Sequence, residues 1–198
     1  MCGLVGWLDY RGFHNLKTLQ QMNKEISHRG PDFSGLWYDE IIGLGHSRLA
    51  IIDTSARANQ PMISDSKRFI LVYNGEVYNY IELQNYLRKK GQIFRTSSDT
   101  EVVLNALKYW GVDAVSKFNG MFALAFYDRK KKTLKLFRDR YGIKPVYYYL
   151  DSSVFLFGSE QKAILKFESF SKKLDKKALM EYFTFQNILT NKTLLEGV

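Results

Sequence analysis

The sequence has one cysteine and three histidines among its 198 residues. A single cysteine excludes an internal disulfide framework, and Cys2, His14, His28 and His46 lack the spacing of a zinc site, so we expect no metal. No apolar run approaches the roughly 18 residues that cross a bilayer, and the N-terminus lacks the basic and apolar segments of a secretory signal. These absences predict a cytoplasmic protein with no membrane partner.

Acidic residues are in the minority, with 20 Asp and Glu against 29 Lys and Arg. Residues 101–198 carry most of the excess, with 17 basic and 10 acidic side chains. The densest basic run, residues 129–132, lies between the apolar segments MFALAFYD and TLKLF, which is typical of a hairpin tip. Charge runs are usually solvated surface, and no nucleic-acid-binding motif is visible, so we expect no nucleic-acid partner.

Blocks of strand pattern alternate with blocks of helix pattern along the chain. Apolar periodicity predicts helices at residues 16–27 and 79–90 and a third after Ser97-Ser98-Asp99, where serine or aspartate is the N-cap. Ile-, Val- and Tyr-rich segments predict strands at 35–39, 41–53 and 68–75, four further strands from 121 onward, and then two helical stretches. This arrangement favours a layered α+β fold with antiparallel sheets.

Cys2 becomes the terminal residue if Met1 is removed. Its free α-amino group then has a pKa of about 7.7–8.0 and can accept the proton of the adjacent thiol, so one residue supplies nucleophile and base. Taken alone, Cys2 is also explained as an accident at a tolerant position, because chain termini are usually unconstrained. The apolar run GLVGWL that follows favours a held terminus instead.

Three downstream positions suit one small zwitterionic ligand. Arg48 lies between apolar positions of a predicted strand, where a guanidinium needs a partner such as a carboxylate. Asn74-Gly75 is either a tight turn or, since a helix pattern follows, an amide and a backbone N–H that bind a developing oxyanion. Asp99 is either a helix N-cap or the partner of an ammonium group.

These residues belong to motifs that resemble the class II glutamine amidotransferase domain, and most closely the N-terminal glutaminase domain of bacterial-type glutamine-hydrolysing asparagine synthetases. The resemblance covers essentially the whole chain. It is carried, in order, by Met-Cys-Gly, HRGPD (28–32), HSRLAIID (46–53), NQPM (59–62), YNGEVYNY (73–80), SSDTEVV (97–103), NGMFALAFYD (119–128), RDRYGIKPVYY (138–148) and FGSEQKAIL (157–165).

The resemblance implies an Ntn-hydrolase fold, a four-layer αββα sandwich of two antiparallel sheets between helical layers. It also implies the catalytic roles. Cys2 would attack the side-chain amide of L-glutamine, its α-amine would carry the proton, and Asn74 with the Gly75 N–H would form the oxyanion hole. Ammonia would leave, and water would hydrolyse the thioester to glutamate. A form that retains Met1 would be inactive, because its Cys2 nitrogen is an amide.

By the same resemblance, Arg48 would bind the substrate α-carboxylate, and Glu76 and Asp99 would hold its α-ammonium. The backbone around Leu49, Ile51 and Ile52 would line the pocket. The motifs HRGPD and RDRYGIKP would be scaffold.

The family continues into an ATP-dependent synthetase domain, so we expect this chain to be part of a longer protein. Residues 1–185 would form the glutaminase domain, and residues 186–198 would begin the link to the synthetase domain. The glutaminase domain needs no cofactor, whereas ATP and magnesium would belong to the synthetase domain. The amidated acceptor, aspartate or a sugar acid, stays open, as do a homodimer and a non-catalytic glutamine-binding or regulatory module.

Overall fold

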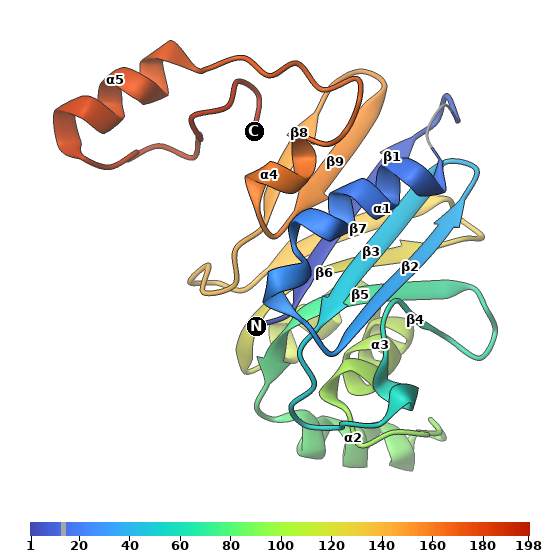
Figure 1. Cartoon of the computed structure of the whole chain (residues 1–198). Helices are drawn as coiled ribbons and strands as arrows, with labels where there is room; N and C mark the ends of the chain where they lie inside the picture. Colours follow the sequence, from blue (N-terminus) through green and yellow to red (C-terminus); the bar gives the residue numbers. More distant parts are fainter. Residues whose placement is uncertain (13–14) are drawn as a thin grey trace.

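Two antiparallel β-sheets form the centre of the computed structural model, which describes residues 1–12 and 15–198 (Figure 1). His14, considered above as a metal ligand, lies outside the described residues. The first sheet contains, in spatial order, β2 (Phe33–Asp39), β3 (Ile42–Arg48), β1 (Gly3–Asp9), β9 (Val154–Gly158) and β8 (Tyr147–Leu150). The second contains β4 (Met62–Ile63), β5 (Phe69–Val77), β6 (Gly120–Asp128) and β7 (Thr133–Arg138).

Helices cover the outer face of each sheet. The first sheet is covered by α1 (Leu16–Glu25) and the short α4 (Gln161–Ile164), and the second by α3 (Asp99–Trp110), against which α2 (Tyr80–Lys89) packs. Figure 1 shows α2 and α3 on one side of the two sheets and α1 and α4 on the other. The layers are therefore helix, sheet, sheet and helix, which confirms the αββα sandwich.

The side-chain alternation of β1 explains how the sheets stack. Successive side chains of a strand point to opposite faces. Val5 and Trp7 pack against α1, whereas Leu4 packs in the apolar layer between the sheets, opposite Val72 and Ala123 of the second sheet. The N-terminal strand is thus buried on both faces, and the residue before it is held at the edge of the inter-sheet layer.

The start of α3 decides between the two N-cap candidates. The Ser98 hydroxyl accepts a hydrogen bond from Thr100 N at 3.0 Å, so Ser98 is the cap. Asp99 becomes the first residue of the helix, and its carboxylate is directed elsewhere. The helix ends at Trp110 and is capped by Gly111, which has a positive φ of 64°.

Two strand predictions were wrong at their ends. The strand predicted at 41–53 stops at Arg48, because Asp32 and the Arg48 guanidinium bind the backbone that follows and replace the ladder bonds of a strand. The strand predicted at 68–75 instead continues to Val77, which pairs with Gly120. Asn74-Gly75 is therefore neither a turn nor a strand end.

The C-terminal part also follows the predicted order. Residues 129–132 form the turn between β6 and β7, as their charge predicted. The last helix, α5 (Lys176–Phe185), extends away from the sheets in Figure 1. The boundary at residue 185 stays a prediction. In the described part of the chain, no helix combines the length and the apolar character required to span a bilayer.

Candidate active site

The thiol of Cys2 lies where β1 and β3 pair. Gly3 is opposite Ser47 in the ladder, so Cys2 faces the end of β3. The Leu49 N–H donates to Sγ at 3.3 Å. Burial raises the pKa of the Cys2 thiol, while the Leu49 N–H and, more weakly, the Arg48 guanidinium act in the opposite direction. The resting group is a thiol, so a reaction at sulfur requires a base.

The motif HRGPD holds the N-terminal segment in place. Arg29 Nε donates to the Cys2 carbonyl at 3.0 Å, and Arg29 Nη1 donates to Glu160 Oε1 at 3.0 Å. A Cβ on Gly30 would lie 2.4 Å from backbone atoms of Ser47, so this loop approaches β3 more closely than any other residue type allows. The motif acts as scaffold around Cys2, in agreement with the sequence-based expectation.

The edge of β5 presents the Gly75 N–H to the pocket. Backbone groups of a strand point alternately to its two edges. Tyr73 N donates to Gln60 Oε1 at 2.6 Å, and Val77 N donates to Asp99 Oδ2 at 3.1 Å. Gly75 lies midway between them, so its N–H points to the same edge. A Cβ here would lie 2.4 Å from the Met121 carbonyl oxygen, which is why glycine is required.

Asn74, the residue of β5 before Gly75, carries a buried side-chain amide. Its side chain has the same orientation along β5 as Val72, which packs between the sheets on the side of Leu4 and Cys2. Asn74 is 2% exposed, and among the described residues its amide Nδ2 has no hydrogen-bond partner. A buried amide that lacks a partner is costly, and an oxygen atom of a ligand would satisfy it.

The guanidinium of Arg48 has a structural task and retains spare donors. Nη1 donates to the Ser55 carbonyl at 2.9 Å and to Asn59 Oδ1 at 2.6 Å, and Nη2 donates to the Asp53 carbonyl. A guanidinium has five N–H donors, so Nε and the second Nη2 hydrogen have no acceptor among the described residues. Neighbouring N–H groups of a guanidinium bind a carboxylate bidentately.

A negative end of the pocket lies across from Arg48. Asp99 Oδ2 accepts from the Tyr73 hydroxyl at 2.7 Å. Burial raises the pKa of Asp99, although the hydrogen bonds from Tyr73 and Val77 oppose this, and Glu76 raises it further. Within residues 1–12 and 15–198, no Lys or Arg forms an ion pair with Asp99 or Glu76. A ligand ammonium group would compensate both carboxylates.

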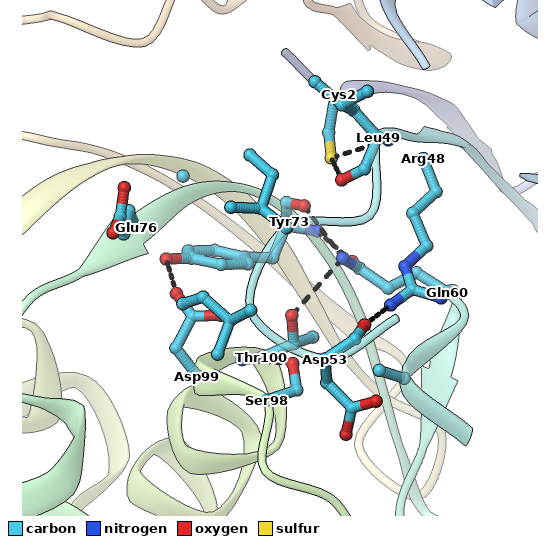
Figure 2. A pocket seen from close by; sticks show the side chains of 14 residues that line it. Cys2, Arg48, Leu49, Asp53, Gln60, Tyr73, Glu76, Ser98, Asp99 and Thr100 are labelled. Atoms are coloured by element: carbon cyan, nitrogen blue, oxygen red, sulfur yellow. Dashed lines mark hydrogen bonds between the residues drawn. The ribbon is translucent and has the colours of Figure 1, made fainter. Parts of the chain in front are cut away.

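One open cavity joins these groups (Figure 2), and its empty space of about 470 Å³ includes solvent at its mouth. The predicted residues that line it are Cys2, Arg48, Leu49, Ile51, Ile52, Gly75, Glu76 and Asp99. Asn74 is the predicted residue outside this lining. No group of three or more His, Cys, Asp or Glu in the described ranges is placed to hold a metal ion.

Sequence reasoning missed several lining residues, namely Asp53, Ala58, Gln60, Tyr73, Ser98 and Thr100. Gln60 is buried, and its side-chain amide binds both backbone groups of Tyr73 in the way that a neighbouring strand would. The sequence did contain a signal for two of these residues, because Asp53 lies in the motif HSRLAIID and Gln60 in the motif NQPM.

Comparison with known proteins gives a consistent result. A family model described as glutamine amidotransferase domain matches residues 1–198. The chain is 40% identical over 187 residues to asparagine synthetase [glutamine-hydrolyzing] 3 of Bacillus subtilis (strain 168), covering 92% of this chain and 30% of that protein. It is 38% identical over 198 residues to asparagine synthetase [glutamine-hydrolyzing] 1 of the same organism, covering 98% and 31%. The chain thus spans about a third of the length of these relatives.

Solved structures share the fold. The glutamine phosphoribosylpyrophosphate amidotransferase from B. subtilis, complexed with ADP and GMP, aligns with a TM-score of 0.68. The alignment covers 82% of this chain and 43% of that one at 22% sequence identity. At this identity the likeness supports the αββα architecture alone.

Proposed function

This chain belongs to the glutamine amidotransferase domain family, and we propose that it hydrolyses L-glutamine to L-glutamate and ammonia through a thioester on Cys2. One observation carries the proposal. In the described part of the chain, a single cavity brings together the Cys2 thiol, a guanidinium with two spare donors and two carboxylates without ion-pair partners. That set is complementary to an α-amino acid whose side chain reaches the thiol.

Substrate binding uses the two charged ends. The glutamine α-carboxylate accepts from Nε and Nη2 of Arg48, and the α-ammonium donates to Asp99 and Glu76. Figure 2 shows Arg48 on one side of the cavity, Asp99 and Glu76 on the other, and Cys2 at the top of the view beside Leu49. A substrate held at both charged groups directs its side-chain amide toward Sγ, which replaces a random encounter by a positioned one.

The first chemical step requires an N-terminal Cys2. After removal of Met1, the free α-amine accepts the thiol proton while Sγ bonds to the amide carbon of glutamine. The carbonyl oxygen becomes an oxyanion, which accepts hydrogen bonds from the Gly75 N–H and Asn74 Nδ2. Donors held on a strand need no reorganisation as the charge develops.

Collapse of the tetrahedral intermediate completes the cycle. The α-ammonium of Cys2 returns its proton to the leaving nitrogen, the C–N bond breaks, and ammonia departs. A water molecule then attacks the thioester with the α-amine as base, the C–S bond breaks, and Sγ recovers a proton. Glutamate leaves, and one water has been consumed for each ammonia released.

We assign the ammonia to a synthetase domain in a longer protein. The relatives named as glutamine-hydrolysing asparagine synthetases support asparagine as the product. We propose aspartate as the acceptor, with ATP and magnesium bound by that domain. Asparagine formed from aspartate, ATP and glutamine by a protein that includes this domain would support the assignment. Amidation of a sugar acid instead would show that the acceptor is not aspartate.

The hydrolysis itself is tested by control of the N-terminus. The chain is produced behind a short extension that a protease removes to leave Cys2 as the first residue, and glutamate release is measured before and after cleavage, with intact masses recorded. We expect turnover only after cleavage, because the uncut form has an amide where the base belongs. Equal rates for both forms would contradict the role of the α-amine.

A further inference from the structure

Asp53 contacts both walls of the cavity, although the proposed reaction gives it no role. Its carbonyl oxygen accepts from Arg48 Nη2 on the wall that binds the substrate carboxylate. Its carboxylate reaches the opposite wall, where Oδ2 accepts from Ser97 N at 3.0 Å and from the Ser97 hydroxyl at 3.1 Å. Figure 2 shows Asp53 between Arg48 and the start of α3.

The link to Ser97 bears directly on the ammonium site. Ser97 precedes Ser98, the N-cap of α3, and Asp99 is the first residue of that helix. A displacement of Ser97 therefore moves the backbone that carries Asp99. The other oxygen of Asp53, Oδ1, accepts from Ser55 N at 2.9 Å and closes the loop whose Ser55 carbonyl binds Arg48.

These bonds keep the carboxylate charged. Hydrogen bonds from Ser55, together with those from Ser97, hold the pKa of Asp53 at about 2. A charged acceptor bonds to backbone N–H groups more strongly than a neutral one. The connection between the walls is thus a set of charge-assisted bonds that persists at any pH at which the protein is expected to function.

We infer that Asp53 is a positioning residue that sets the spacing between Arg48 and Asp99, and so makes the cavity selective for ligands with a carboxylate and an ammonium on one carbon. This inference rests on the proposed glutamine site. It assigns Asp53 no contact with the reacting atoms. The loss of its charge therefore weakens substrate binding and leaves the chemistry of bound substrate nearly unchanged.

The test compares Asp53→Asn with Asp65→Asn in the full chain with Cys2 as first residue. Asp65 is a matched control because it is an exposed aspartate that pairs with Arg95 in the segment before Ser97. We expect Asp53→Asn to raise KM for glutamine about tenfold or more, the cost of one charge-assisted hydrogen bond, with kcat within about twofold. We expect Asp65→Asn to leave KM and kcat unchanged.

Covalent labelling of Cys2 separates positioning from general damage. A glutamine analogue with a diazoketone in place of the amide must bind both Arg48 and Asp99 before it reacts with Cys2, whereas iodoacetamide reacts without binding either residue. We expect Asp53→Asn to slow labelling by the analogue at least about tenfold and to leave the iodoacetamide rate unchanged. If Asp53→Asn does not fold, Ser97→Ala takes its place. This variant removes one of the three hydrogen bonds to the Asp53 carboxylate, so we expect it to slow labelling by the analogue to a smaller extent.

The outcomes are distinct. An active wild type whose Asp53→Asn variant keeps its KM and its labelling rate overturns the positioning role alone. Equal slowing of both labelling reagents also overturns it, because the damage is then general. A wild type that neither hydrolyses glutamine nor reacts with the analogue overturns the proposed function, and this inference with it.

Discussion

The protonation of His46 is expected to control how stability depends on pH, because this side chain is fully buried behind the candidate site. Its Nε2 lies 3.0 Å from the Tyr73 carbonyl oxygen, which can only accept, so Nε2 carries the hydrogen. In the described structure Nδ1 is buried without a hydrogen-bond partner. A second proton would place an unpaired charge in the core. Burial, opposed by the Tyr73 bond and assisted by the nearby Arg48, lowers the pKa of His46 to about 4.

The magnitude follows from linkage. In the unfolded chain His46 binds a proton below its ordinary pKa of about 6.5, whereas the native state binds it only near pH 4. The stabilisation by neutral His46 is thus fully present above pH 6.5 and is lost as the pH falls through 4. The loss reaches about 2 kcal/mol at pH 5 and about 3 kcal/mol at the lower limit.

The substitution His46→Gln tests this value. A glutamine Nε2 can still donate to the Tyr73 carbonyl but does not titrate. Urea unfolding of wild type and variant near pH 7 and pH 5 gives two free-energy differences, and we expect wild type to lose about 2 kcal/mol more than the variant between them. His28→Gln, at a side chain that is 55% exposed, supplies the baseline for removal of one imidazole. A difference between wild type and His46→Gln that does not change with pH would refute the reasoning.

The remaining predictions concern the site. Gly75→Ala places a Cβ 2.4 Å from the Met121 carbonyl oxygen, so calorimetry should show a loss of about 1–3 kcal/mol of stability, together with loss of glutaminase activity. Asn74→Ala should lower kcat roughly 100- to 1,000-fold with little change in KM, as steady-state kinetics will show. Arg29→Leu removes the bond to the Cys2 carbonyl and should lower kcat about tenfold; an unchanged kcat would assign Arg29 to folding alone. Because burial raises the pKa of Cys2, iodoacetamide should label the Met1-retaining form with a pH midpoint above the ordinary value of about 8.5, and a midpoint below it would contradict the burial argument.

The order of elements could be predicted from the sequence because each depends on local pattern. The amphipathic spacing of Leu19 and Met22 defined α1, and the alternation of Leu4 with Val5 is that of a strand buried on both faces. The sequence leaves two N-cap residues open for this helix, since Ser98 and Asp99 are both good caps. The structure resolves this choice, because the Asp99 carboxylate accepts from Tyr73 and Val77 instead.

The shape of the pocket wall could not be predicted, because long-range polar contacts determine it. Arg48 was expected to seek an anion, yet three of its donors bind the loop that follows it. The pairing of the Gln60 side chain with Tyr73 backbone joins residues 13 positions apart and leaves no periodic signal. The resemblance to a known family named the residues, whereas these contacts explain why they converge.

The most direct test of the account is glutamate release from glutamine by the protein with Cys2 as its first residue, measured beside Cys2→Ala with both intact masses recorded. The account predicts turnover by the wild type and none above background by the variant. Retention of turnover in Cys2→Ala would contradict Cys2 as the nucleophile and, with it, the mechanism proposed for this domain.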